Sequence, residues 1–320
     1  MAVSTRLIKA RIKSIGNTRK ITKAMELVAG AKMRKAVQMT VDSRHYSNNV
    51  KQIVDEIRQV IDQQSHPLLF GRKVSAKTVL IIGASDRGMC GGFNSQLVRK
   101  SVEFIKSRTE PVQVIIVGKK IESSMRRASA EIMASFPSIS NSPSFERSKS
   151  IGQLAYDEFL HHRADRVFVC YSDFKSAISQ VPTVVQLLPI VPEDELASEP
   201  EESFQTDEED TKTPISEYKR LAQDRTLIAK NPPDYNIKFE PTPRYVLDHL
   251  LPRLIDTRLY QAMLESTASE QSARMMAMRS ATDSATEMLD NLTFTFNQAR
   301  QASITREISE ISAGKAALEN

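Results

Sequence analysis

Proline is confined to the middle of this sequence. All 14 prolines lie between Pro67 and Pro252, so residues 1–66 and 253–320 contain none. A proline inside an α-helix removes one hydrogen bond and clashes with the preceding turn, at a cost of about 3 kcal/mol. Glycine occurs only twice in the first flank and once in the second. Both ends of the chain can therefore form long, uninterrupted helices.

Apolar residues recur at helical spacing in both flanks. They are Val50, Ile53, Ile57 and Val60 in the first flank, and Leu289, Leu292, Phe296, Ala299, Ile304, Ile308 and Ile311 in the second. One apolar face on each helix is what the seam of a coiled coil requires. Since the flanks are far apart in the sequence, we expect an antiparallel pair, in which about 60 residues would form a rod of about 90 Å. Residues 266–286 are rich in small side chains and methionine, so we expect the coil to be thin and weakly held there.

Between the flanks, strand-like runs alternate with helical stretches. The apolar runs are 78–85, 112–119, 166–174 and 181–190, and the helical stretches are 91–108, 119–129 and 150–164. Continuous runs of valine and isoleucine separated by helices are typical of a mainly parallel sheet covered on both faces. The sequence therefore predicts an α/β fold: a long antiparallel coiled coil of the N- and C-terminal helices plus a small doubly wound, Rossmann-like sheet domain.

These patterns divide the chain into four segments. We expect an N-terminal coiled-coil helix over residues 1–66, an α/β domain over 75–192, an acidic insert or linker over 193–241 and a C-terminal coiled-coil helix over 242–320. The acidic segment contains several prolines and has no strong apolar period. Its first half is therefore expected to be disordered or a surface loop.

The formal net charge of +5 hides a strong asymmetry. Residues 6–35 contain ten lysines and arginines and a single acid, Glu26, whereas residues 193–210 contain ten acids and no basic residue. A basic N-terminal helix suggests an acidic protein surface, a nucleic acid or an anionic lipid as its partner. Nucleic-acid-binding segments usually interleave aromatic residues with basic ones, and residues 6–35 contain no aromatic residue. A basic coiled coil that binds nucleic acid is therefore the weakest alternative, and we expect no nucleic-acid partner.

A glycine-rich turn, GASDRGMCGGFN, follows the first apolar run at residues 83–94. Gly83 and Gly88 have the spacing of a phosphate-binding P-loop, but Met89 and Cys90 stand where that loop needs lysine and serine or threonine. The glycines do not fit the dinucleotide-binding pattern either. We interpret the segment as a tight strand-to-helix turn with a structural role. A nucleotide-using enzyme built on the sheet domain is the alternative.

No other pattern of catalytic or ligand-binding residues stands out. The five histidines and two cysteines have no zinc-ligand spacing, and no G-x-S-x-G nucleophile motif occurs. We therefore expect no catalytic residue, no cofactor and no metal site. Two cysteines argue against a disulfide framework. No apolar run is long enough to predict a membrane span, and the N-terminus lacks the apolar segment of a secretory signal. These features favour an interaction or mechanical subunit over an enzyme.

Several stretches resemble the γ subunit of F-type ATP synthases, the central rotor stalk. The most specific are IGNTRKITKAMELVAGAKMRKA at 15–36, SDRGMCGGFN at 85–94 and NQARQASITREISEISAGKAAL at 297–318. The second is similar to the family signature D-R-G-L-C-G-G-x-N, with Met89 in place of the usual leucine. Residues 179–189 and 268–283 also resemble the family, so the likeness spans nearly the whole chain in the family's order.

The resemblance implies a shaft that is not itself an enzyme. In the family, the coiled coil enters a hexamer of three α and three β subunits, which hold the nucleotides, and the sheet domain lies near the ε subunit and the c-ring. One copy per complex, with a δ subunit in the same assembly, would couple proton flow through the c-ring to ATP synthesis or hydrolysis by rotation, and would regulate ATPase activity. The expected location is peripheral, on the cytoplasmic face of the bacterial plasma (inner) membrane.

The resemblance also implies roles for individual residues. The positions that face or contact β are Met25, Lys32, Arg34, Lys35, Arg300, Gln301, Thr305 and Glu307. The structural signature comprises Asp86, Arg87, Gly88, Cys90, Gly91, Gly92 and Asn94. For the partner-contact positions, the alternative is an ordinary solvated or seam position of a helix.

The sequence departs from the short family members at about residues 195–235. This insert resembles that of the photosynthetic γ subunits, whose chloroplast forms carry a redox-active cysteine pair. The segment here contains no cysteine, which excludes disulfide control through it. Its acidic run, in a chain with a basic helix, motivates the hypothesis of a steric or electrostatic brake.

Overall fold

The computed structural model describes residues 5–60, 67–70, 77–139, 143–190, 240 and 242–318. Apart from residue 240, the predicted acidic insert over 193–241 lies outside these residues. The chain forms two compact units, one of Met1–Gly30 with Arg274–Asn320 and the other of Ala31–Ala273. We call them the stalk unit and the sheet unit. Their boundary falls inside both long helices, whereas the four segments expected from the sequence follow helix ends, so that division stays a prediction.

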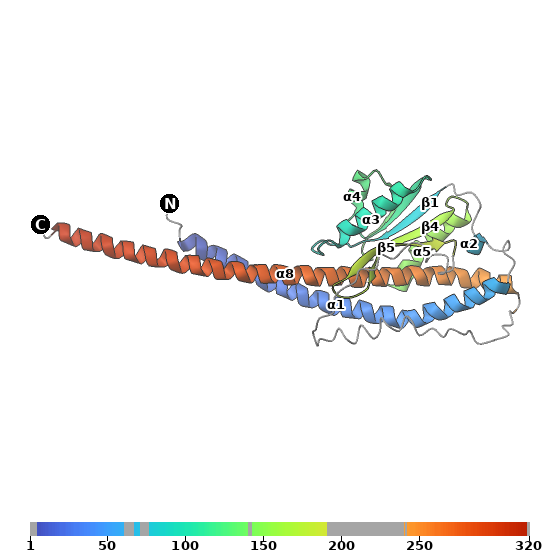
Figure 1. The fold of residues 1–320 in the computed structure, drawn as a ribbon, viewed down its shortest axis with the longest axis horizontal. Helices are drawn as coiled ribbons and strands as arrows, with labels where there is room; N and C mark the ends of the chain where they lie inside the picture. The colour runs from blue at the N-terminus through green and yellow to red at the C-terminus, as the bar shows by residue number, and fades with distance from the viewer. Residues whose placement is uncertain are drawn as a thin grey trace. The chain divides into compact units, whose positions relative to one another are not determined.

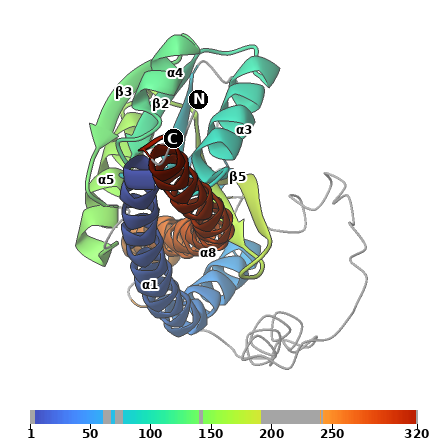
Figure 2. The same cartoon turned by 90° about the vertical axis from the view of Figure 1, so that its left-hand side faces the viewer.

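Two long helices begin and end the described chain. Helix α1 spans Thr5–Val60, 56 residues, and α8 spans Pro243–Leu318, 76 residues. In the stalk unit their terminal parts lie side by side and antiparallel, with both chain ends at the same end of the pair (Figures 1 and 2). This confirms the antiparallel pair predicted from the proline-free flanks. Neither these helices nor any other helix in the described ranges combines the length and apolarity that crossing a membrane needs.

One five-stranded sheet forms the centre of the sheet unit. Its strands are β1 (Thr78–Gly83), β2 (Val112–Val117), β3 (Glu131–Phe136), β4 (Arg166–Phe174) and β5 (Gln180–Leu188). They lie in the order β3-β2-β1-β4-β5. The neighbours are parallel except for β4 and β5, which are antiparallel. The sheet is therefore mainly parallel, as predicted.

Helices cover both faces of this sheet (Figure 1). Helices α3 (Phe93–Ser107) and α4 (Glu122–Arg127) pack on one face, and α2 (Pro67–Phe70), α5 (Phe145–Leu160) and the first part of α8 pack on the other. In β1, Leu80 and Ile82 point into the first core, whereas Val79 and Ile81 point into the second. Burial on both faces explains why β1 is a continuous apolar run. The predicted doubly wound architecture is confirmed.

Strand β3 is the strand that the sequence pattern did not predict. It lies at one edge of the sheet, and its six residues, EIMASF, are exposed or half-buried. An edge strand has a neighbour on one side only and is less buried, so it needs no long run of valine and isoleucine to mark it.

Candidate functional site

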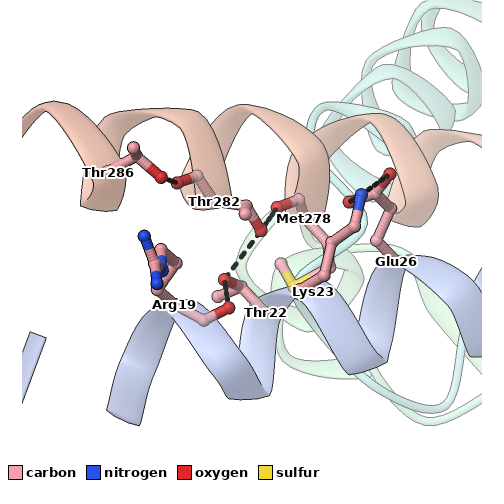
Figure 3. Close-up of polar contacts among 7 residues, drawn as sticks. All are labelled: Arg19, Thr22, Lys23, Glu26, Met278, Thr282 and Thr286. Carbon is pink, nitrogen blue, oxygen red and sulfur yellow. Dashed lines mark hydrogen bonds and ion pairs between the residues drawn. The ribbon is translucent and has the colours of Figure 1, made fainter. Parts of the chain in front are cut away.

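A pair of threonines joins the two helices of the stalk unit. Thr22 of α1 and Thr282 of α8 face each other, with 2.8 Å between their Oγ1 atoms (Figure 3). Each hydroxyl also lies near a carbonyl of its own helix, 3.0 Å from Arg19 O for Thr22 and 2.8 Å from Met278 O for Thr282. A polar pair in a helix seam favours one register, because a slip would separate the two hydroxyls.

The α1 surface around this pair is strongly basic. Lys23 pairs with Glu26 at 3.0 Å (Figure 3). Glu26 is the single acid among ten basic residues in 6–35. The pairing therefore neutralises one of these cations and leaves a positive helix surface.

The C-terminal end of α8 extends past the first described turn of α1 (Figure 1). Residues 300–313 are all exposed, and Ile304, Ile308 and Ile311 have exposed fractions of 48%, 63% and 74%. The spacing of these isoleucines predicted that they continue the seam of the coiled coil. That prediction is wrong, because α1 as described, from Thr5 onward, does not reach them. They form an apolar stripe on a single helix.

The predicted β-contacting residues fall into three groups. Met25 is half-buried on α1 in the stalk unit; Lys32, Arg34 and Lys35 are exposed on α1 in the sheet unit; and Arg300, Gln301, Thr305 and Glu307 are exposed on α8 in the stalk unit. The register set by the threonine pair places Met25 opposite about residue 279, roughly 30 Å along the helix from Arg300. The fold does not gather these residues into one site, and their contact with a partner stays a prediction.

In the sheet unit, the glycine-rich turn joins the carboxyl ends of three neighbouring strands. Asp86 Oδ1 accepts hydrogen bonds from the backbone N–H groups of Lys119 at 3.2 Å and Ser138 at 2.8 Å. Lys119 follows β2 and Ser138 follows β3, while Asp86 itself follows β1. A single carboxylate thus fixes the relative positions of three strand ends.

Three other side chains close the turn on itself. Asn94 Nδ2 donates to Ser85 Oγ at 2.7 Å and to Cys90 Sγ at 3.2 Å. Ser85 Oγ also donates to the carbonyl of Arg87 at 2.8 Å. The signature residues Asp86, Cys90 and Asn94, together with the backbone of Arg87, therefore form a hydrogen-bonded turn.

The glycines of the turn differ in how strictly they are required. Gly91 has a φ of 55°, a left-handed conformation that favours glycine, and Gly92 is the N-cap of α3. A Cβ added at Gly88 would lie 3.5 Å from the side chain of Lys120, an ordinary contact. The strictest requirement lies outside the signature at Gly118, where φ is 99° and an added Cβ would overlap the carbonyl of Ala84.

Helix α8 fills the crevice beside the turn. In open α/β sheets, ligands bind outside the carboxyl ends of the strands where the strand order reverses, which here is at β1 and β4. Met263, Ser266, Thr267 and Glu270 of α8 lie against the ends of β1 and β2, where they line a cavity of about 10 Å³. Such a space holds about one water molecule. This cavity beside the end of β1 is too small for a nucleotide.

The same stretch of α8 is held by hydroxyl groups. Ser266 donates to Gly83 O at 2.7 Å, Ser269 to Ser172 O at 3.0 Å and Ser272 to Ala177 O at 2.5 Å. The three serines are buried, so the expected weakly held coil over 266–286 is wrong for its first part. Small side chains allow α8 to approach the sheet closely, and their hydroxyls bond to backbone carbonyls. The expectation considered only the small apolar area that these side chains bury. In the sequence, the recurrence of serine every three residues is the signal that could have indicated these contacts.

Both cysteines are buried free thiols. Ser101 Oγ donates to Cys170 Sγ at 3.3 Å, and burial raises the pKa of this thiol to about 11. A protonated, buried thiol is a poor nucleophile. Within the described ranges, no group of three or more histidines, cysteines and acids could hold a metal ion.

Sequence comparisons find one family along the whole chain. The family model described as ATP synthase matches residues 4–318. The ATP synthase gamma chain of Heliobacterium modesticaldum is 39% identical over 311 residues, which cover 97% of this chain and 98% of that protein. The gamma chain of Alkaliphilus metalliredigens is 37% identical over 318 residues, or 99% of this chain and all of that protein.

Solved structures show a similar fold at lower identity. A chain of the Euglena gracilis mitochondrial ATP synthase assembly of OSCP, F1 and c-ring has a TM-score of 0.60 and 18% identity, covering 98% of this chain and 94% of its own. A chain of the central stalk and c-ring structure from Tetrahymena thermophila has a TM-score of 0.56 and 22% identity, covering 82% of this chain and 99% of its own. These likenesses concern the fold.

Proposed function

This chain belongs to the ATP synthase gamma-chain family, and from that premise we propose that it is the central shaft of a rotary ATP synthase. The observation that carries the proposal is the extent of the match, since the relatives align with this chain from end to end. The shaft couples proton flow through a membrane c-ring to ATP synthesis or hydrolysis on the α and β subunits.

The shaft does no nucleotide chemistry of its own. The crevice at the end of β1 is filled by α8 and leaves about 10 Å³, which supports a non-catalytic subunit. Its effect on catalysis comes through asymmetry. A binding partner shifts an equilibrium by its differential affinity for the states involved, and a shaft with different faces presents a different surface to each of three catalytic sites as it turns.

Two surfaces of the helices suit contact with the α and β subunits. Lys32, Arg34 and Lys35 place exposed positive charge on α1, and charge–charge attraction across water is screened and tolerant of rotation. The isoleucine stripe at Ile304, Ile308 and Ile311 is exposed on α8. A lone helix with an apolar stripe needs a surrounding surface to cover it, and a collar formed by the hexamer supplies one.

The remaining predicted contacts lie close to that stripe in the sequence. Arg300, Gln301, Thr305 and Glu307 offer exposed charged and hydrogen-bonding groups on the same end of α8. We assign them contact with β loops and an effect on coupling. Met25 is half-buried on α1. We assign it a position that faces β, farther from the C-terminal end of α8 than Arg300.

The complex proposed for this shaft has one copy of the chain with three α, three β, one δ and one ε subunit and a c-ring. It lies on the cytoplasmic face of a bacterial plasma membrane, to which this chain is bound peripherally. No nucleic acid and no cofactor are bound by the chain itself.

An affinity purification tests the proposal. The tagged chain is recovered from its own cells, and the eluate and the isolated chain are both assayed for ATP hydrolysis. Two partners of similar size with Mg-dependent ATPase activity, and no activity in the isolated chain, are expected. Activity in the isolated chain would return the sheet domain to consideration as an enzyme, and recovery of nucleic acid in place of those partners would do the same for the basic helix.

The acidic insert is proposed to restrain the motor. Deletion of residues 196–230 from the chain in the assembled complex is expected to raise ATP hydrolysis or relieve its inhibition. Unchanged hydrolysis and unchanged inhibition would remove this role.

A further inference from the structure

Helix α8 changes its mode of attachment as it passes the sheet. Up to Met263 it packs with apolar side chains in the core beneath the sheet, among them Leu251, Leu254 and Leu259. From Ser266 onward, hydroxyl-to-carbonyl hydrogen bonds join α8 to the sheet, and Ala273 adds an apolar contact with the other core. The apolar part of the interface resists separation of helix and sheet, but apolar packing is not directional. The hydroxyl bonds are directional and can therefore fix the helix in one position.

The three serines, Ser266, Ser269 and Ser272, reach three different parts of the sheet. Their acceptors are Gly83 at the end of β1, Ser172 in β4 and Ala177 in the turn between β4 and β5. We call these serines the serine row. Each step of three residues advances about 4.5 Å along the helix and turns its direction by about 60°. The row therefore holds α8 at three heights and from three directions.

All three acceptors are backbone carbonyls, and one of them is also bonded to a side chain of the sheet. The backbone carbonyl of Ser172 lies in β4 and accepts from the Ser269 hydroxyl. At the turn, Gln180 Nε2 donates to Ala177 O at 3.0 Å and approaches Ser272 Oγ at 3.4 Å, which ties the turn and the helix together.

Glycine allows α8 to approach the end of β1. A Cβ added at Gly83 would lie 3.1 Å from Met263 Cε and 3.4 Å from Ser266 Oγ, tighter than most real contacts. The end of β1 and this turn of α8 are therefore in direct contact, and a side chain at position 83 would crowd Met263 and Ser266.

We propose that the serine row locks α8 to the sheet domain against rotation and axial slip, and that it thereby positions the shaft for coupling. This inference rests on the proposed function. Torque that enters a shaft through its sheet domain must be passed to α8 without slip, and the serine row provides directional contacts for this. The serines are positioning residues, since they touch no nucleotide and act through the orientation of α8.

The experiment compares coupling with hydrolysis in the assembled membrane complex. Complexes carrying S266A/S269A/S272A are reconstituted in proton-tight vesicles, and ATP hydrolysis and ATP-driven proton uptake are measured on the same preparation. The matched control is S280A/S284A, two exposed serines of the same helix. S272A and S272T are compared as well, because threonine retains the hydroxyl donor.

The triple variant is expected to keep hydrolysing ATP while its ratio of proton uptake to hydrolysis falls about threefold or more, as three directional bonds are lost. The control should keep the wild-type ratio, and S272T should exceed S272A. A purely structural defect would lower assembly, and so reduce both activities together without changing their ratio. If the triple variant does not assemble, S269A and S272A are each expected to show the same fall to a smaller degree.

A wild-type ratio in every serine-row variant would overturn the inference and leave the proposed function standing. Proton uptake by the wild-type complex that does not depend on this chain would instead contradict the proposed function.

Discussion

Asp86 shows how one residue of a glycine-rich turn can serve a structural purpose. Its carboxylate accepts two backbone hydrogen bonds, from segments that follow β2 and β3, while the residue itself follows β1. The turn resembles a phosphate loop in its sequence because both need tight backbone turns. The difference lies in the side chains: Asp86 brings its own negative charge to N–H groups of the kind that a phosphate would otherwise accept from.

Asp86→Ala should lower the free energy of unfolding by about 1–3 kcal/mol, because two hydrogen bonds to a charged acceptor are lost. Asp86→Asn keeps the Oδ1 acceptor and should lose less. Urea denaturation of the purified chain, followed by circular dichroism, measures both. Equal stability of the alanine variant and the wild type would show that the bonds to Lys119 and Ser138 contribute nothing.

Gly118→Ala should destabilise the sheet unit by at least about 2 kcal/mol, because the position is left-handed and the new methyl would overlap the carbonyl of Ala84. Gly88→Ala is the matched control, with an ordinary contact to Lys120 and an expected change below about 1 kcal/mol. Thermal melting of both variants distinguishes them. A larger loss of stability for Gly88→Ala than for Gly118→Ala would show that position 88 constrains the backbone more than position 118.

Cys170 predicts a pH dependence. Burial raises the pKa of its thiol from 9.0 to about 11 in the folded chain. Between these two values the folded chain keeps a proton that the unfolded chain loses. The protonated thiol therefore makes its full contribution to the free energy of unfolding below pH 9, and this contribution is lost as the pH rises toward 11. Between pH 9 and pH 11, the free energy of unfolding of Cys170→Ala should fall by about 2 kcal/mol less than that of the wild type. Urea denaturation at either end of it gives the comparison, and equal losses would contradict the assignment.

At the scale of elements, the long helices and the buried strands could be predicted because each has a strong local cause. Proline-free flanks permit α1 and α8, and burial on both faces makes β1 a continuous apolar run. The failures also have causes. The edge strand β3 lacks such a run, and the isoleucines of α8 have helical spacing whether or not a partner covers them. Periodicity shows that a face exists but not what lies against it.

In the candidate site, too, some features could be predicted from the sequence and others could not. The turn was predicted to be structural because Met89 and Cys90 replace the residues a phosphate loop needs. The serine row was not predicted, because its acceptors are backbone carbonyls brought close only by the fold. The positions of Met25 and of the residues after 299 were given by resemblance, and local sequence alone could not have distinguished them from solvated helix positions.

The threonine pair of the stalk unit should be measurable as an energetic coupling. In a double-mutant cycle of Thr22→Val and Thr282→Val, the coupling free energy should be about 0.5–1.5 kcal/mol, because the two hydroxyls lie 2.8 Å apart in a half-buried seam. Denaturation of the four proteins, monitored by helical circular dichroism, supplies it. Strictly additive losses would mean that the pair does not fix the register.

At the scale of the whole molecule, the chain is a shaft with two compact units, and α8 occupies the space beside the end of β1. One unit carries the paired helices, with a basic surface and an exposed apolar stripe. The other anchors α8 to a sheet through apolar packing and the serine row. Membership of the gamma-chain family connects these features, because a rotating shaft needs weak, adaptable contacts along its helices and firm contacts at its base.

Observation of rotation tests this account most directly. The complex is immobilised through its α and β subunits, and a bead is attached to a cysteine introduced at Ser123, which is exposed on α4, while the native Cys90 and Cys170 are buried. On addition of Mg-ATP, the bead should turn continuously in one direction and stop when ATP is removed. A bead that stays still while the same complexes hydrolyse ATP would contradict the claim that this chain is the shaft.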